Sequence, residues 1–138
     1  MDADIEHVVN HYATLRVLIT GSREWRDRDV IRQALLSIAS VHGIPARNVT
    51  VVHGAARGAD SIAAEIAAQL GMVVEPHPAD WKTHGKAAGV IRNAEMVCLG
   101  AGVCLAFPLG RSVGTQDCMR RARKAGITVI DYGDRCTA

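Results

Sequence analysis

Two patterns of hydrophobic residues alternate along the chain. Short apolar runs rich in β-branched residues are each followed by a stretch in which apolar residues recur at helical spacing. The runs predict five strands, at residues 16–20, 49–53, 72–75, 103–107 and 127–131. The stretches between them predict helices that start near residues 27, 60, 86 and 114, three of them ending at Gly43, Gly71 and Gly126. This alternation favours an α/β fold, with a five-stranded parallel sheet covered by helices on both faces.

The composition agrees with one small domain built around an aliphatic core. The chain has 138 residues, of which 49% are apolar and 22% are charged, and aromatic residues are scarce. A chain of this length normally forms a single domain. We assign residues 16–138 to that domain and residues 1–15 to an N-terminal extension, whose apolar spacing suits a short amphipathic helix.

Charge and cysteine usage narrow the class of protein. The formal net charge of +2 is too small to indicate a nucleic-acid-binding surface. No apolar stretch reaches the roughly 20 residues that a membrane helix needs, and the acidic first residues do not resemble a signal peptide. Four cysteines without a Cys-x-x-Cys pair indicate reduced thiols in a cytoplasmic protein. His7 and His11 lack a clear third ligand, so we predict no metal site and no cofactor.

Three glycine-containing loops follow strands and lead into helices, at residues 20–23, 54–60 and 108–115. The C-terminal ends of parallel strands meet at one edge of a sheet, so we expect a crevice there, where the strand order reverses. Helix N-termini offer unpaired N–H groups and a positive dipole end that suit phosphate. The loops also carry basic and hydroxyl side chains, namely Arg23, Arg57, Arg111, Ser22, Ser112 and Thr115. Together they predict an anionic ligand, although the chain has neither a P-loop nor a standard dinucleotide fingerprint.

Four further residues are candidates for the same crevice. Arg92 and Asn93 lie in the third predicted helix, and Trp25 and Trp81 lie in loops at the same edge. Arg92 either reaches the crevice or extends its guanidinium to solvent. Each indole either stacks on a base or ribose, or covers the end of a helix. The residues alone leave both pairs of alternatives open.

Three motifs in this order resemble the cpYpsA-related group of the SLOG superfamily: Val-Leu-Ile-Thr-Gly-Ser-Arg at 17–23, Val-His-Gly-Ala-Ala-Arg-Gly-Ala-Asp at 52–60, and Ile-Arg-Asn-Ala-Glu-Met at 91–96. The resemblance covers residues 16–131 and extends to the LOG phosphoribohydrolases and the DNA-processing protein DprA. It implies a Rossmann-like fold that binds a nucleotide or nucleotide-derived ligand, often as a sensor in bacterial or phage conflict systems. It also implies self-association, so we expect a homo-oligomer.

The resemblance further implies roles for individual residues. The first loop would contact a base, ribose or phosphate, Asp60 would cap the helix after the second loop, and the Gly-Thr end of the third loop would cradle phosphate. The candidate ligand-binding residues are Gly21, Ser22, Arg23, Trp25, Gly54, Arg57, Gly58, Asp60, Trp81, Asn93, Gly110, Arg111, Ser112, Gly114 and Thr115.

The catalytic position departs from the enzymes of the superfamily. The LOG enzymes carry Pro-Gly-Gly-x-Gly-Thr-x-x-Glu, whose glutamate assists cleavage of an N-glycosidic bond. Here the loop is longer and Cys118 occupies the glutamate position, while Asp117 is rotated by about 100° around a helix. The arginine of the LOG third helix has a counterpart in Arg92. The candidate catalytic residues are therefore Arg92 and Asp117, with Asp60 or Glu95 as other sources of a carboxylate.

The favoured hypothesis is a nucleotide-binding module without chemistry of its own. One alternative is a phosphoribohydrolase acting on nucleoside monophosphates, which needs a carboxylate near the ribose. A second is single-stranded DNA binding as in DprA, which the small net charge and the few aromatic residues disfavour. We predict that Arg23→Ala and Arg57→Ala each weaken nucleotide binding by roughly 1–3 kcal/mol.

Overall fold

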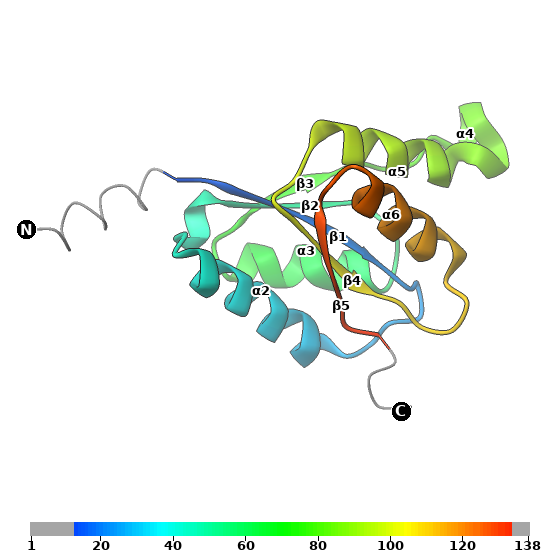
Figure 1. Ribbon diagram of the computed structural model, residues 1–138. Helices are drawn as coiled ribbons and strands as arrows, with labels where there is room; N and C mark the ends of the chain where they lie inside the picture. The colour runs from blue at the N-terminus through cyan, green and yellow to red at the C-terminus, as the bar shows by residue number, and fades with distance from the viewer. Residues whose placement is uncertain (1–12, 134–138) are drawn as a thin grey trace, which may run out of the picture.

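The apolar runs form one parallel five-stranded sheet in the computed structural model, which describes residues 13–133 (Figure 1). The strands are β1 (Leu15–Gly21), β2 (Val49–His53), β3 (Val73–Pro76), β4 (Val103–Phe107) and β5 (Thr128–Asp131). Their order across the sheet is β3-β2-β1-β4-β5, and every neighbouring pair is parallel. Strands β2 and β3 thus lie on one side of β1, and the chain then crosses back so that β4 and β5 lie on the other side. This order places the topological switch point between β1 and β4.

Helices cover both faces of the sheet, as predicted (Figure 1). The elements are α2 (Arg28–His42), α3 (Ala59–Gln69), α4 (Trp81–His84), α5 (Ala88–Leu99) and α6 (Val113–Lys124), with 3-10 turns at Ala46–Asn48 and Gly85–Ala87. One face carries α2 and α3, and the other carries α5 and α6. The arrangement is a Rossmann-like α/β fold.

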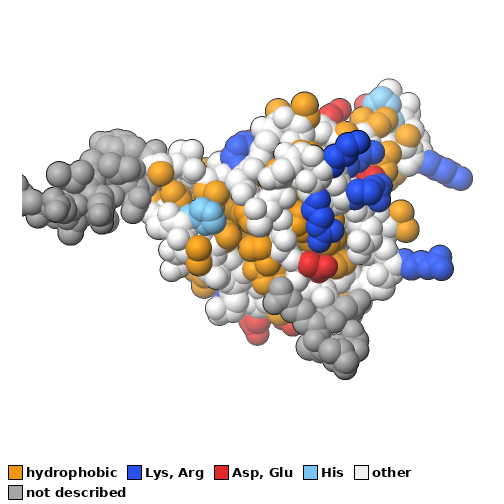
Figure 2. Space-filling model, in the orientation of Figure 1, with side chains coloured by type: hydrophobic (Ala, Val, Ile, Leu, Met, Phe, Trp, Pro, Cys, Tyr) orange, Lys and Arg blue, Asp and Glu red, His pale blue; other side chains and the backbone are white. Residues whose placement is uncertain are grey.

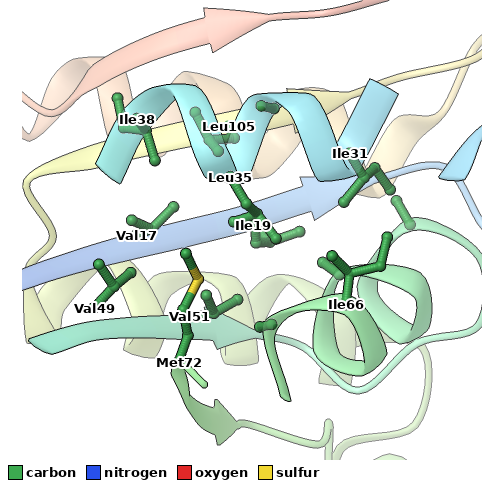
Figure 3. Packing of buried hydrophobic residues seen from close by; sticks show 14 of the residues in the cluster. Val17, Ile19, Ile31, Leu35, Ile38, Val49, Val51, Ile66, Met72 and Leu105 are labelled. Carbon is green, nitrogen blue, oxygen red and sulfur yellow. The ribbon is translucent and has the colours of Figure 1, made fainter. Parts of the chain in front are cut away.

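Successive side chains of β1 point to opposite faces of the sheet and pack in both apolar clusters. Val17 and Ile19 pack with α2 and α3 in the larger apolar cluster, whereas Leu18 packs with α5 and α6 in the smaller one. Figure 3 shows the larger cluster, in which aliphatic side chains from the strands and both helices interdigitate. Phe107 is its one completely buried aromatic residue. The core is therefore mainly aliphatic, because close packing of helices on a parallel sheet favours small and branched side chains.

Local signals mark most helix ends correctly. The Asp27 carboxylate accepts a hydrogen bond from the Val30 N–H at 3.2 Å and caps α2. Gly43 ends α2 in the left-handed region, with φ of 63°. The region from residue 76 to 88 differs from the prediction of one loop and one continuous helix. Asp80 caps a separate helix, α4, and a 3-10 turn joins it to α5.

Two sequence predictions concern residues at the chain ends. The predicted amphipathic helix of residues 1–15 lies outside the described residues except for its last three positions, and the pair His7 and His11 within it lies wholly outside them. Within residues 13–133, no helix combines the length and the apolar character needed to cross a membrane.

Candidate functional site

A cavity of about 510 Å³ opens at the C-terminal ends of β1 and β4, at the switch point of the sheet. The loops after β1, β2 and β4 all reach it, together with α4, the following 3-10 turn and α5. Its lining residues are Ile19, Thr20, Gly21, Ser22, Arg23, Glu24, Ala56, Asp60, Trp81, Lys86, Gly89, Val90, Arg92, Asn93, Met96, Leu109, Ser112, Val113, Gly114 and Thr115. The fold therefore brings together the three loops that the sequence singled out.

The loop after β1 is tied to its neighbours through backbone atoms. The Ser22 N–H donates to the Phe107 carbonyl at the end of β4 at 2.9 Å, and the Ser22 carbonyl accepts from the Ala59 N–H of α3 at 3.1 Å. The exposed Arg23 guanidinium lies over the Trp81 ring, 5.6 Å from its centroid. This cation–π pair joins the first loop to α4 across the cavity wall.

Asp60 is the buried acid of the site, although it does not cap its helix. The N-terminal cap position of α3 is Gly58, and Asp60 lies inside the first turn. Its Oδ2 instead accepts from the Gly54 N–H at 3.1 Å and the Ala56 N–H at 3.3 Å. Its Oδ1 is buried and has no hydrogen-bond partner. Burial raises the pKa of Asp60 to about 6, despite the opposing effect of these backbone donors and of nearby Arg92.

Two glycines in the second loop are required by close packing. A Cβ on Gly54 would collide with the Arg92 guanidinium, which donates to the Gly54 carbonyl. Gly58 has φ of 77°, and a Cβ there would collide with the Ser22 carbonyl in the loop after β1. Neither residue lines the main cavity. Gly54 lines a smaller cavity of about 230 Å³, which shares Arg23, Ala56, Trp81 and Arg92 with the main one.

Arg92 and Asn93 connect the loops from the side of α5. Besides the Gly54 carbonyl, the Arg92 guanidinium contacts the Asn93 Oδ1 at 2.9 Å, and Arg92 lines the main cavity rather than extending to solvent. The Asn93 Nδ2 donates to the Gly114 carbonyl and to the Asp117 Oδ2, both at 3.1 Å. These bonds hold the start of α6 against α5.

Asp117 is a structural carboxylate in this protein. It is buried, and it accepts from Asn93, from Arg120 at 2.8 Å and from Arg121 at 2.9 Å. It does not line the cavity, and neither does the exposed Glu95. The position of Asp117 therefore does not support its predicted catalytic role, because it lies outside the cavity and bonds side chains of α5 and α6.

The side chain at the position of the LOG glutamate is equally withdrawn from the cavity. Cys118 is completely buried, and burial raises the pKa of its thiol to about 11. It is protonated at neutral pH and does not line the cavity. Helix α6 consequently supplies no carboxylate and no thiolate to a bound molecule.

The start of α6 supplies neutral donors instead. The Ser112 hydroxyl donates to the Thr115 Oγ1 at 2.6 Å, and both residues line the cavity with Gly114. Ser112 has φ of 32°, and Ala55 in the second loop has φ of 58°; these are the two non-glycine residues with positive φ among residues 13–133. Both stand in loops at the same edge of the sheet, where strained backbone often accompanies function. The predicted Gly110 and the exposed Arg111 precede this turn and do not line the cavity.

Two further predicted contacts lie elsewhere. The Trp25 indole is 7% exposed, meets the Phe107 ring edge-on at 5.3 Å, and donates its Nε1–H to the Asp27 carbonyl at 2.9 Å. It covers a helix start rather than facing a ligand. The exposed Arg57 pairs with Glu24 at 2.9 Å and does not line the cavity.

The sequence analysis missed the rim of the cavity. Lys86 lines it from the 3-10 turn after α4. Val90, Leu109 and Val113 also line it and are 36%, 39% and 74% exposed, so with the half-exposed Trp81 they form an apolar rim. The missed signal was an apolar residue in a loop: Leu109 is 39% exposed and lines the cavity.

The described residues contain no cluster of three or more His, Cys, Asp or Glu side chains that could hold a metal ion. The basic residues late in α6 gather on the outer surface over that helix (Figure 2). Arg120 and Arg121 there pair with Asp117, which places them outside the cavity.

Comparison with known proteins gives two matches. Residues 15–84 match the family described as YspA, cpYpsA-related SLOG family, a span that contains the first two loops and α4. The Gene 61 protein of Mycobacterium phage D29 is 58% identical over 125 residues, which cover 87% of this chain and 98% of that protein. The chain belongs to the YspA, cpYpsA-related SLOG family, and this membership suggests a role in binding a nucleotide-related ligand.

Proposed function

We propose that this protein binds a nucleotide or nucleotide-derived ligand in the cavity between β1 and β4, and that it acts as a sensor of that ligand. The observation that carries the proposal is the meeting of three kinds of group around one cavity. Neutral hydroxyl and N–H donors come from the start of α6, guanidinium groups come from Arg23 and Arg92, and an exposed indole comes from Trp81.

These groups complement the parts of a nucleotide. The N-terminus of α6 carries a partial positive charge that favours a phosphate. The half-exposed Trp81 ring and the neighbouring apolar rim suit a planar base. The volume of about 510 Å³ falls within the roughly 300–1,000 Å³ that is typical of small-molecule sites. A sensing role in bacterial or phage conflict, which the family resemblance implies, is part of the proposal.

The test is calorimetric titration with a panel of ribonucleoside mono- and diphosphates and dinucleotides. We expect at least one to bind, and Arg23→Ala to weaken that binding by roughly 1–3 kcal/mol through loss of a charge-assisted contact. Arg32→Ala is the matched control, because the partly exposed Arg32 lies on α2 and donates to the Gln69 side chain outside the cavity. Absence of any binding, or equal losses in the two variants, would contradict the proposal. Native mass spectrometry of the purified protein would add any co-purified ligand and the number of subunits, and self-association stays a prediction until then.

A second candidate function rests on Asp60. A buried carboxyl group with a pKa of about 6 beside the cavity is suited to general acid–base work, such as cleavage of an N-glycosidic bond. Incubation with each nucleoside monophosphate, followed by chromatography for the free base, tests this function. Release of base by the wild-type protein but not by Asp60→Asn would support it, and intact substrate after prolonged incubation would reject it.

A further inference from the structure

The buried polar atoms of residues 13–133 include two side-chain atoms without a hydrogen-bond partner, the Asp60 Oδ1 and the His53 Nε2. Buried acceptors in folded proteins are almost always paired, so an unpaired one calls for a physical reason. Of these two residues, Asp60 alone lines the main cavity, and its side chain is buried. Its free oxygen therefore belongs to a side chain of the cavity wall, and a donor from a bound molecule would complete its pairing.

The described contacts of the groups around Asp60 do not include its Oδ1. The Asp60 Oδ2 accepts from two backbone N–H groups, which fixes the orientation of the carboxyl group. The Arg92 guanidinium bonds the Gly54 carbonyl and the Asn93 Oδ1, and the Arg23 guanidinium lies over Trp81. Neither cation donates to Asp60 in the described contacts. An O–H or N–H of a bound ligand is the donor that would complete the pairing.

We infer that the Asp60 Oδ1 accepts a hydrogen bond from a ribose hydroxyl of the bound nucleotide, and that this contact makes the protein selective for ribonucleotides over deoxyribonucleotides. The inference rests on the proposed function and assigns one part of that site.

The placement of the other groups around the cavity favours the sugar, rather than the phosphate or the base, as the part of the nucleotide that donates to the Asp60 Oδ1. A carboxylate repels phosphate, whose complement is the start of α6 with Ser112 and Thr115. The base face is matched by the Trp81 indole, which is half exposed at the rim, whereas Asp60 is 6% exposed. Ribose lies between phosphate and base in every nucleotide, and its hydroxyls are neutral donors. Burial sets the pKa of Asp60 near 6, so at pH 7.5 the group is mainly an ionised acceptor, and hydrogen bonds to ionised acceptors are strong.

The experiment compares nucleotides that differ only in the hydroxyl groups of the sugar and share the same base and phosphate. Each ribonucleoside 5′-monophosphate is titrated by calorimetry at pH 7.5 beside its 2′-deoxy and 3′-deoxy counterparts. We expect at least one deoxy form to bind roughly tenfold or more weakly than its ribonucleotide, as loss of a hydrogen bond to a charged group predicts. Equal binding of all three forms would overturn the inference and leave the proposed function standing. If no form bound in this or the wider panel, the proposed function itself would fail.

The Asp60→Asn variant identifies the acceptor. Its amide oxygen can accept from the Gly54 and Ala56 N–H groups, which leaves an NH₂ group in place of the free oxygen. We expect this variant to bind ribo- and deoxyribonucleotides within about threefold of each other. Asp27→Asn makes the same chemical change at the cap of α2, outside the cavity, and should keep the wild-type preference. A preference retained in Asp60→Asn, or one that follows the base instead of the sugar, would overturn the assignment. Should Asp60→Asn not fold, the comparison of sugars on the wild-type protein still decides.

Discussion

Asp60 and Asp117 are both buried carboxylates near the start of a helix, yet their surroundings differ sharply. Asp117 accepts hydrogen bonds from Asn93, Arg120 and Arg121, and it faces the junction of α5 and α6. Asp60 has donors on one oxygen only and lines the cavity. A buried carboxylate whose two oxygens both accept hydrogen bonds stabilises the fold. A buried carboxylate with one unpaired oxygen lowers the stability of the folded state, and a ligand that donates to that oxygen can restore it. The comparison teaches that partners, rather than residue type or burial, separate a structural acid from a functional one.

The largest expected effect is on how stability depends on pH. Burial raises the pKa of Asp60 from 3.8 in the unfolded chain to about 6, so the folded state holds the proton more tightly. Asp60 therefore favours folding most at low pH, and that contribution is lost as the pH rises from about 4 to 6. Relative to Asp60→Asn, the unliganded wild-type protein should lose up to about 3 kcal/mol over this range. Urea denaturation of both proteins at pH 4, 5 and 7 measures it. If the stability difference between the wild type and Asp60→Asn does not change with pH, burial does not raise the pKa of Asp60, and the distinction drawn from Asp117 fails.

A smaller effect is expected from removing the satisfied acid. Asp117→Ala leaves the Asn93 amide and two arginines without an acceptor, so the free energy of unfolding should fall by about 1–3 kcal/mol. Any nucleotide affinity should stay within about threefold, because Asp117 does not line the cavity. Glu65→Ala is the control, since it removes an acid from an exposed ion pair with Arg28 and should change stability little. A loss of binding without a loss of stability in Asp117→Ala would reverse the two roles.

The smallest effect is expected at Arg57. The sequence places this arginine with Arg23 as a ligand contact, but its side chain is exposed and pairs with Glu24 outside the cavity. Arg57→Ala should leave nucleotide affinity within about twofold of the wild type, as for other exposed pairs. The measurement is the titration used for Arg23→Ala. Equal losses at both arginines would mean that the second loop closes over the ligand and brings Arg57 into the site.

Most of the fold could be predicted from the sequence because its signals are local. A β-branched run such as residues 103–107 needs no distant information to be identified as a buried strand, and β4 spans those residues. Gly43 marks the end of α2 because a left-handed residue is needed there. The separate helix α4 was missed because four residues are too few to show a helical period. Its signal is the Asp80 cap, which accepts from the Thr83 N–H at 3.1 Å.

The site was predicted less completely, since side-chain direction depends on distant partners. Trp25 follows the first loop by two residues, but its ring packs against Phe107, 82 positions further along the chain. Gly54 was read as a ligand contact, and the structure shows that it makes room for Arg92 from α5. In both cases the deciding partner comes from another part of the sequence, which no local motif names.

The sequence by itself determined the α/β class, the five strands, and the edge of the sheet at which three loops would meet. These follow from hydrophobic period and from the geometry of parallel strands, which need no knowledge of specific contacts. Only the tertiary structure decided which polar groups face the cavity. In the folded chain Asp117 accepts hydrogen bonds from side chains of α5 and α6, whereas one oxygen of Asp60 has no donor. Hydrogen-bond pairing is a property of groups brought together by folding, so the unpaired acid beside the cavity could be identified only after every partner was in place.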